Sequence, residues 1–324
     1  MKSYWIKTEH GKAVLEFRDV PVPQAQAGQI VIRVHASALN RGELIVGGVV
    51  HGGAEKVGGN EAAGVVHAVG AGVSALKPGM RVMGRARGGF AEYAVMDAHQ
   101  AMIAPERLNW EQAAAVPVSF LTAYEMLFPH GGLRQGEWLL VTGASSGVGV
   151  ASIQTAVMLG AHTIGTSGSA EKLARLRTAG LEVGIMTRGA DFAARVKEAS
   201  GGTGATLIVN GVGGSVFAEC LRALAYKGRI ATVGYVDGVL NSTIDLGALH
   251  ANRYMVFGVS NARLEAEGRA EAVRGFVRDV LPALADGRIT PLIDKAYAFE
   301  ELPAAKARME ANAQVGKIVV RVAD

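Results

Sequence analysis

Residues 141–150 have the sequence VTGASSGVGV, which is the strongest structural signal in the chain. Apolar residues precede it and the helix-like stretch VGVASIQTAVMLGA follows, so we expect a strand, a glycine-rich turn and a helix in that order. Gly143 permits the turn out of the strand, Gly147 lets backbone N–H groups approach a pyrophosphate, and Gly149 lets the helix pack close to the sheet. The spacing departs from a strict G-x-G-x-x-G, so a plain strand–helix turn is the alternative to a dinucleotide site.

Outward from this loop, apolar strands alternate with amphipathic helices. The expected strands are HTIGTS (162–167), EVGIMT (182–187), TLIVNGV (206–212), RIATVGY (229–235) and MVFGVS (255–260). Helical stretches lie between them, the last being VFAECLRALAYKG at 216–228. Continuous apolar strands with helical connections predict an α/β fold, a doubly wound parallel sheet covered on both faces.

The remaining sequence is mostly β in character. Before residue 118, short segments between Gly/Pro turns predict a compact antiparallel, barrel-like domain: YWIKTEH, AVLEFRDV, QIVIRVHASAL, AGVVHAVG, RVMGRA and FAEYAVM. After residue 262 we expect one long helix, roughly 264–286, and a closing strand KIVVRV. A lone terminal strand needs a partner, so we expect it to pair with the N-terminal β domain.

Composition excludes several classes of protein. The 324 residues carry a net charge of only +4 and no Lys/Arg run longer than two, so no nucleic-acid partner is expected. The single cysteine, Cys220, permits no internal disulfide. The polar N-terminus and the lack of a long apolar run predict no membrane association and a cytoplasmic location.

The end of the second parallel strand predicts which nicotinamide cofactor is preferred. An NAD site usually has an acidic residue there, but HTIGTS ends without a carboxylate. Ser167, Ser169 and Lys172 offer hydroxyl donors and a cation to a 2′-phosphate. Glu171 is the contrary residue, although a carboxylate in the first turn of a helix also favours the helix dipole. We therefore predict NADP(H); for Lys172 the alternative is a solvated helix charge.

Several segments, in order, resemble one family. They are ASALNRGEL, VGGNEAAGVVHAVGAGV, KPGMRVMG, GGFAEYAV, AAAVPVSFLTAYEML, GASSGVGVASIQ, SAEKL, GRIATVGY, GRITPLIDKAYAFEEL and MEANAQVGKIVV. Their order and spacing resemble the medium-chain dehydrogenase/reductases, quinone oxidoreductase subgroup. The resemblance implies a GroES-like β-rich catalytic domain (1–117 and 263–324), interrupted by a Rossmann NADP-binding domain (118–262). It also implies an active site between the domains and a homodimer.

Departures from the zinc-dependent branch of that family predict a zinc-independent enzyme. Gly59-Asn60-Glu61 replaces the Gly-His-Glu segment whose histidine binds catalytic zinc, and neither Leu39 nor Asn40 supplies a thiolate. The four-cysteine structural zinc lobe is also absent. A catalytic zinc needs three N, S or O ligands, and the set His51, Glu61 and His67 is the weaker alternative.

The resemblance implies hydride transfer from NADPH to a quinone or an α,β-unsaturated carbonyl compound. Asn40 matches a family asparagine near the nicotinamide ribose and the substrate; an Asx-type turn cap is the alternative. The tyrosine that many relatives carry a few residues later is missing, because Leu44, Ile45 and Val46 stand there. His51 is the nearest ionisable candidate for the proton donor, and a simply exposed histidine is the alternative.

Other cofactor contacts are implied by position alone. They are Thr122, Ser146, Gly147, Val148, Asn210, Gly234, Tyr235, Phe257, Val259 and Asn312. Arg188 occupies the place of a family tyrosine that stacks on adenine, so we expect it to pair with the 2′-phosphate or stack on the ring, unless it is a surface arginine. Two other functions remain open, a non-catalytic NADPH-binding redox sensor and a carbonyl or alcohol dehydrogenase.

Overall fold

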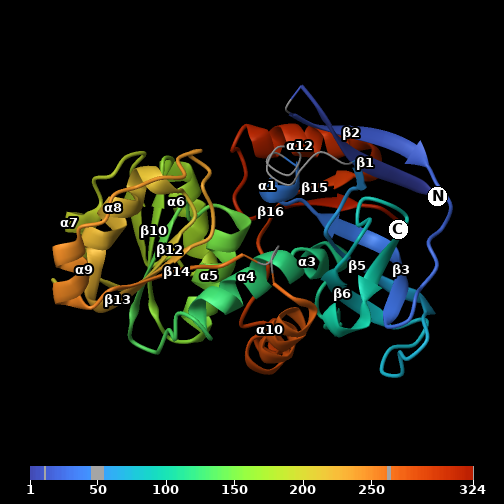
Figure 1. The fold of residues 1–324 in the computed structure, drawn as a ribbon, viewed down its shortest axis with the longest axis horizontal. Coiled ribbons are helices and arrows are strands. Elements are labelled where there is room, and N and C mark those ends of the chain that lie inside the picture. Colours follow the sequence, from blue (N-terminus) through green and yellow to red (C-terminus); the bar gives the residue numbers. More distant parts are fainter. Residues whose placement is uncertain (11, 45–54, 261–263, 324) are drawn as a thin grey trace. The chain divides into compact units, whose positions relative to one another are not determined.

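The computed structural model describes residues 1–10, 12–44, 55–260 and 264–323. The chain forms two compact units (Figure 1). Unit 1 comprises Met1–Val118 together with Arg269–Asp324, and unit 2 comprises Ser119–Gly268. No helix within the described ranges is long and apolar enough to cross a membrane.

Two sheets make up most of unit 1. Their strands are β1 (Lys2–Glu9), β2 (Lys12–Asp19), β3 (Gln29–Ala38), β4 (Lys56–Val57), β5 (Glu61–Val69), β6 (Arg81–Arg85), β7 (Tyr93–Asp97), β8 (Ala101–Ile103), β15 (Ile293–Ala298) and β16 (Lys317–Arg321). The smaller sheet has the order β2-β1-β4, and the larger β15-β16-β3-β5-β6-β8, with β7 also paired to β3. The closing strand β16 pairs antiparallel with β3, which confirms the predicted host.

Short helices complete unit 1. They are α1 (Arg41–Leu44), η1 (Ala98–Gln100), α3 (Trp110–Ala114), α11 (Leu281–Asp286), η3 (Phe299–Glu301) and α12 (Leu302–Glu310), with most of α10 (Ala266–Asp279). The predicted single helix over 264–286 is wrong, because α10 ends at Asp279 and α11 begins at Leu281. Pro282 lies in the first turn of α11; it has no N–H to donate and its ring crowds the preceding turn, so the helix cannot continue through it.

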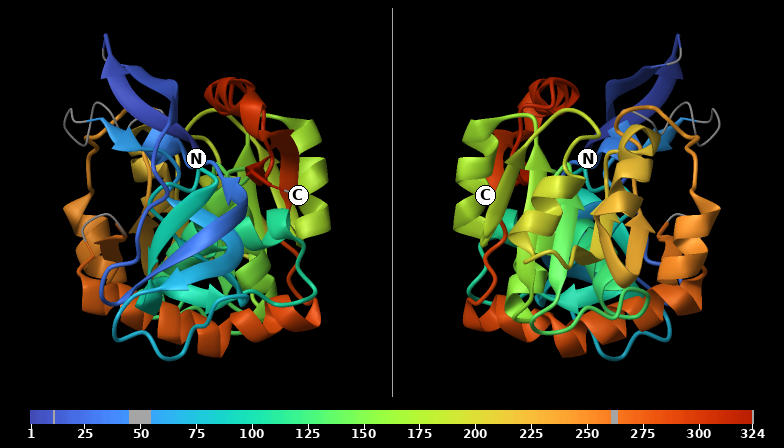
Figure 2. Two further views of the ribbon diagram at one scale, coloured as in Figure 1. Left: turned by 90° about the vertical axis from the view of Figure 1, so that its right-hand side faces the viewer. Right: turned by 90° about the vertical axis from the view of Figure 1, so that its left-hand side faces the viewer.

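Unit 2 is a six-stranded parallel sheet with helices on both faces (Figure 2). Its strands are β9 (Trp138–Thr142), β10 (His162–Ser167), β11 (Val183–Met186), β12 (Ala205–Asn210), β13 (Leu224–Thr232) and β14 (Met255–Gly258). Its helices are α4 (Pro117–Leu127, which starts in unit 1), α5 (Gly147–Met158), α6 (Ala170–Leu176), η2 (Arg177–Ala179), α7 (Ala193–Ala199), α8 (Gly214–Ala223) and α9 (Leu246–Asn252). The predicted α/β architecture is confirmed.

The strand order β11-β10-β9-β12-β13-β14 fixes where a ligand is expected. The chain winds outward from β9 in one direction and from β12 in the other, so the order reverses between these two strands. In open α/β sheets, ligands bind beyond the carboxyl ends of the strands at such a reversal.

One predicted element limit differs from the structure. Residues 224–228 were expected to end a helix, but β13 already begins at Leu224 and its pairing with β12 shifts register between Ala205 and Leu207. The domain limits predicted from the sequence lie after residues 117 and 262, and the two compact units divide after Val118 and Gly268.

Candidate functional site

The glycine loop, residues 143–149, joins β9 to α5 in unit 2. Gly143 has a φ of +62°, a left-handed conformation that favours glycine. A Cβ on Gly149 would lie 2.6 Å from the carbonyl oxygen of Ala144, so only glycine allows the helix this close to the strand. The Ser146 hydroxyl caps α5 by accepting the Gly149 N–H at 3.0 Å. Both glycines thus have the geometry the sequence predicts, and α5 presents its N-terminal N–H groups at this point.

Predicted 2′-phosphate residues gather at the end of β10. The Ser167 hydroxyl accepts the Ser169 N–H at 3.3 Å, and the Ser169 hydroxyl accepts the Lys172 N–H at 3.3 Å as the cap of α6. Arg188, exposed in the segment after β11, lies against Gly168: a Cβ there would be 2.7 Å from Arg188 Cγ and 2.9 Å from its Nε. Sequence reasoning missed Gly168, whose lack of a side chain lets the guanidinium lie over the strand end.

Asn210 and Thr142 join the carboxyl ends of β12 and β9. Asn210 Oδ1 accepts the Thr142 hydroxyl at 2.9 Å and the N–H groups of Val212 and Gly213, and its Nδ2 donates to the Gly213 carbonyl. The side chain is fully buried and its bonds to Val212 and Gly213 shape the loop after β12.

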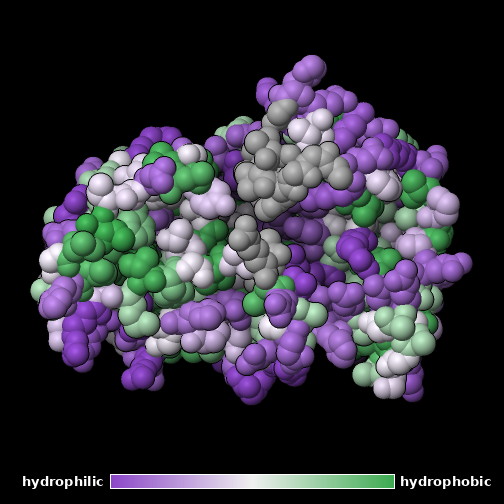
Figure 3. All heavy atoms as spheres, in the orientation of Figure 1, coloured by the Kyte–Doolittle hydropathy of each residue, from purple (hydrophilic) through white to green (hydrophobic). Residues whose placement is uncertain are grey.

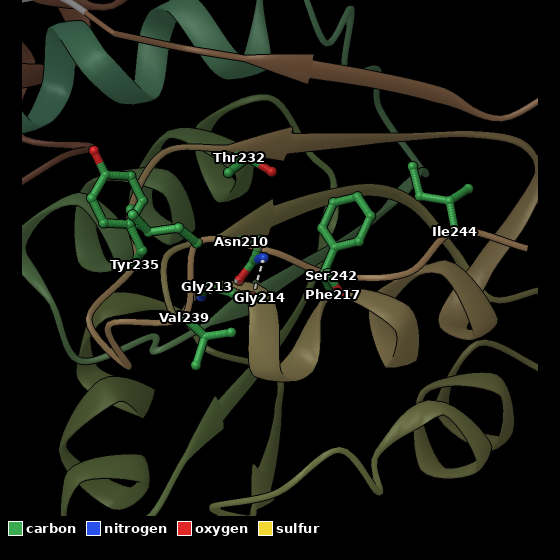
Figure 4. A pocket seen from close by; sticks show the side chains of 11 residues that line it. Asn210, Gly213, Gly214, Phe217, Thr232, Tyr235, Val239, Ser242 and Ile244 are labelled. Atoms are coloured by element: carbon green, nitrogen blue, oxygen red, sulfur yellow. Dashed lines mark hydrogen bonds between the residues drawn. The ribbon is translucent and has the colours of Figure 1, made fainter.

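A cavity of about 230 Å³ opens beside this loop (Figure 4). Three predicted cofactor residues line it, Asn210, Gly234 and Tyr235, together with apolar side chains from α8 and the segment after β13. Phe217 and Ile244 lie at the opposite end from Tyr235 in Figure 4. Other predicted contacts do not line it: Ser146, Gly147 and Val148 at the start of α5, Thr122 buried in α4, and the half-buried Phe257 and Val259 at the edge strand β14.

Unit 1 contains a second constellation, which we call the polar cluster: Asn40, Asn60, Glu61 and Lys317. Lys317 Nζ donates to Glu61 Oε1 at 2.7 Å, to Asn40 Oδ1 at 2.9 Å and to the Leu39 carbonyl at 2.9 Å. The Lys317 and Glu61 side chains are only 6% and 0% exposed, so this is a buried ion pair.

Further bonds complete the polar cluster. Asn40 Nδ2 donates to Asn60 Oδ1 at 2.8 Å and to Glu61 Oε1 at 2.7 Å. Glu61 Oε2 accepts the Val118 N–H at 2.7 Å. The turn-cap alternative for Asn40 is therefore wrong for its side chain, and only its carbonyl accepts from Glu43 and Leu44 at the start of α1.

Sequence reasoning missed Lys317. The residue opens the closing strand KIVVRV, and a lysine at the start of a buried strand is a signal, since lysine is almost never buried unless paired. Nothing in the sequence indicates its partner, because 256 residues separate it from Glu61.

Glu43 is a buried carboxyl beside the polar cluster. Its Oε1 accepts the Gly59 N–H at 2.9 Å, whereas its Oε2 is buried and has no hydrogen-bond partner among the described residues. Burial raises the pKa of Glu43 to about 7, opposed by the charge of Lys56 and the Gly59 N–H and reinforced by the charge of Glu61. Sequence reasoning did not single this residue out.

The described structure does not bring the remaining predicted site residues together into one site. His51 lies outside the described residues. His67 is exposed, with its ring centroid 4.9 Å from that of Tyr93, and Glu61 is held by Lys317. Within the described ranges, no group of three His, Cys, Asp or Glu side chains could hold a metal ion. Asn312, at a φ of +52°, accepts a hydrogen bond from Arg41 Nη2 at 2.6 Å.

Comparisons with known proteins agree with both units. Residues 26–106 match the alcohol dehydrogenase GroES-like domain family, and residues 147–274 match the zinc-binding dehydrogenase family. The chain is 30% identical over 328 residues to the synaptic vesicle membrane protein VAT-1 homolog of Homo sapiens, a match covering 96% of this chain and 83% of that protein.

Two solved structures are similar over almost the whole chain. Mycobacterial Rv1454c complexed with NADPH has a TM-score of 0.89 at 28% identity, and Escherichia coli quinone oxidoreductase complexed with NADPH has one of 0.88 at 25%. Each match covers 99% of this chain and 100% of the other. The chain therefore belongs to the medium-chain dehydrogenase/reductase superfamily, as a quinone oxidoreductase-like member.

Proposed function

We propose that this protein is an NADPH-dependent oxidoreductase that reduces quinones or α,β-unsaturated carbonyl compounds. The observation that carries the proposal is the gathering of Ser167, Ser169 and Arg188 at the end of β10. An NAD site usually holds a carboxylate there, whereas these side chains suit a 2′-phosphate. The similarity to two structures that contain NADPH supports the same cofactor.

The residues of unit 2 fit a dinucleotide. Gly149 lets α5 start close to β9, because a Cβ there would lie 2.6 Å from the Ala144 carbonyl oxygen. The N-terminus of α5 would then offer its free N–H groups to a pyrophosphate. Ser146, Gly147 and Val148 would hold the phosphates, and Arg188 with Lys172 would hold the 2′-phosphate. When bound, NADPH supplies the hydride.

The polar cluster would bind the carbonyl group of the substrate. Reduction of an enone joins a hydride to the β-carbon and a proton to the α-carbon, and it oxidises NADPH to NADP⁺. Charge that develops on the carbonyl oxygen is stabilised by fixed hydrogen-bond donors. We propose that this chemistry needs no metal, because Asn40 and Asn60 bond to each other and Lys317 neutralises Glu61, which leaves the cluster poorly suited to a cation.

We also propose a cytoplasmic homodimer. Exposed apolar side chains gather over the part of unit 2 that bears α9 and β14 (Figure 3): Leu240, Leu246, Met255 and Val256 are 71%, 71%, 55% and 42% exposed. The outer side of β14 is an open sheet edge, to which a second copy would pair its own β14. Light scattering on the purified protein tests this, and a monomer at all concentrations would contradict it.

Steady-state kinetics tests the proposed activity. We expect NADPH oxidation with a quinone and with 2-alkenals, weak turnover of simple ketones, and a lower KM for NADPH than for NADH. At least tenfold better efficiency with NADH would overturn the cofactor assignment. Tight NADPH binding without turnover of any compound would favour a redox sensor, and preferred turnover of simple ketones would favour a carbonyl or alcohol dehydrogenase. Stoichiometric zinc in untagged protein would contradict metal independence.

A further inference from the structure

We propose that Asn60 is the hydrogen-bond donor that polarises the substrate carbonyl, through its side-chain N–H groups. This deepens the proposed function and rests on it. In the sequence, Asn60 stands where the zinc-dependent branch has a zinc-binding histidine. The hydrogen bonds of the polar cluster give it a role of its own.

Lys317 sets the orientation of both asparagine amides. An ammonium group has three donors and no acceptor, so the oxygen of Asn40, not its nitrogen, faces Lys317 Nζ at 2.9 Å. The Asn40 amide nitrogen then points to Glu61 and Asn60, at 2.7 and 2.8 Å. Its two N–H groups are thereby used, so Asn40 has no strong donor left for a substrate.

The same chain of hydrogen bonds sets the orientation of the Asn60 side-chain amide. Since Asn40 donates to it, Asn60 presents Oδ1 to Asn40, and its own Nδ2 is turned away. Within the described ranges this nitrogen makes no hydrogen bond, and the residue is half-buried, not enclosed. The cluster therefore leaves one pair of N–H groups, both on Asn60, available for an incoming oxygen.

The backbone around Asn60 holds this donor in place. Its carbonyl accepts the Ala86 N–H at 3.1 Å, and Glu61, the next residue, is locked in the buried ion pair. Gly59, just before it, has a φ of +90°, and a Cβ there would lie 2.2 Å from the Phe90 nitrogen. A donor fixed before the reaction needs no reorganisation as negative charge develops on the carbonyl oxygen, which is the condition for a large catalytic effect.

The test compares Asn60→Asp, Asn60→Ala and the control Asn109→Asp. Asn60→Asp keeps an oxygen for Asn40 but removes both N–H donors, and Asn60→Ala removes them without adding charge. Asn109→Asp makes the same amide-to-acid change in unit 1 at an exposed cap that needs only an oxygen, since Asn109 accepts the Gln112 N–H at 2.8 Å. We expect kcat to fall about 100-fold in both Asn60 variants while the Kd for NADPH stays unchanged, and we expect no change in the control.

A spectroscopic probe separates this inference from the proposed activity. The probe is para-dimethylaminocinnamaldehyde, a conjugated enal. Its absorption maximum shifts to the red when its carbonyl oxygen accepts a strong hydrogen bond. It is bound in the presence of NADP⁺, so that it cannot be reduced. We expect a red shift in the unmodified protein and in Asn109→Asp, and none in either Asn60 variant. The absence of a red shift in the unmodified protein would overturn the assignment of Asn60. So would an Asn60→Ala variant that keeps both the red shift and the kcat of the unmodified protein. A shift that depends on Asn60 in a protein without turnover overturns the reductase and keeps the donor.

Discussion

The glycine loop of unit 2 and the polar cluster of unit 1 are built in opposite ways. The loop uses seven consecutive residues and works through backbone N–H groups and a helix end. The cluster uses side chains from residues as far apart as Asn40 and Lys317, and two of its members are a buried ion pair. A backbone site tolerates side-chain changes but not added bulk, whereas a side-chain network tolerates neither the loss nor the exchange of a charge. The following predictions test this difference, from the largest expected effect to the smallest.

Lys317→Met should be the most damaging change. It leaves Glu61 buried without its cation, so we expect a loss of about 3–5 kcal/mol in the free energy of unfolding, measured by urea denaturation at pH 7.5. Lys306→Met is the control, because Lys306 pairs with the exposed Glu310 one helical turn away in α12, and such i,i+4 pairs are worth about 0.3–0.5 kcal/mol. Equal losses in the two variants would contradict the special role of the buried pair.

Glu43→Gln should remove a pH dependence of stability. The pKa of Glu43 rises from 4.5 to about 7 on folding, so the folded state holds its proton more tightly. Stability from this group is therefore complete below pH 4.5 and is lost as the pH rises through 7, by about 3 kcal/mol in total. We expect urea denaturation at pH 5 and pH 8 to show a smaller difference in Glu43→Gln than in the unmodified protein.

The control for this change is Glu16→Gln. The pKa of Glu16 is lowered to about 2 by hydrogen bonds from Arg18 and Lys7, so this carboxylate stays ionised over the whole range tested. Its variant should keep the pH dependence of the unmodified protein. If Glu43→Gln keeps it as well, the buried carboxyl is not its source.

Gly149→Ala should damage the glycine loop through bulk alone. The added methyl group would lie 2.6 Å from the Ala144 carbonyl oxygen, so α5 must move away from β9, at a cost of about 1–3 kcal/mol. Isothermal titration should show weaker NADPH binding. Gly247→Ala, at an exposed position of α9 where the nearest atom is an Asp245 side-chain oxygen at 3.3 Å, should lower neither stability nor affinity. Unaltered NADPH affinity in Gly149→Ala would separate the loop from the cofactor.

Arg188→Gln should have the smallest effect, confined to the choice of cofactor. Loss of one exposed guanidinium should raise the Kd for NADPH about tenfold, or about 1.4 kcal/mol, and leave the Kd for NADH unchanged. Arg195→Gln is the control, since Arg195 is also exposed and pairs with Asp191 in the same part of unit 2. Parallel weakening of NADPH and NADH binding in Arg188→Gln would place Arg188 on the adenine ring instead of the 2′-phosphate.

The sequence alone was enough to predict the α/β architecture, the segments that form most of the parallel strands, the glycine loop and the family. These features depend on local patterns: runs of apolar residues, helical spacing and glycines within one turn. Its errors were local as well. The break between α10 and α11 follows from Pro282, a signal that the helical pattern on both sides obscured.

The polar cluster required the folded chain. Pairing of β16 with β3 brings Lys317 to Asn40, and β5 starts beside them with Glu61. Hydrogen bonds then decide which way each amide faces, and hence that Asn60 has donors to offer while Asn40 does not. The residue type indicates how many hydrogen-bond donors a side chain has. Its partners in the folded chain determine how many of those donors are still available to a substrate. That difference is why the cofactor loop was evident in ten consecutive letters and the expected substrate donor was not.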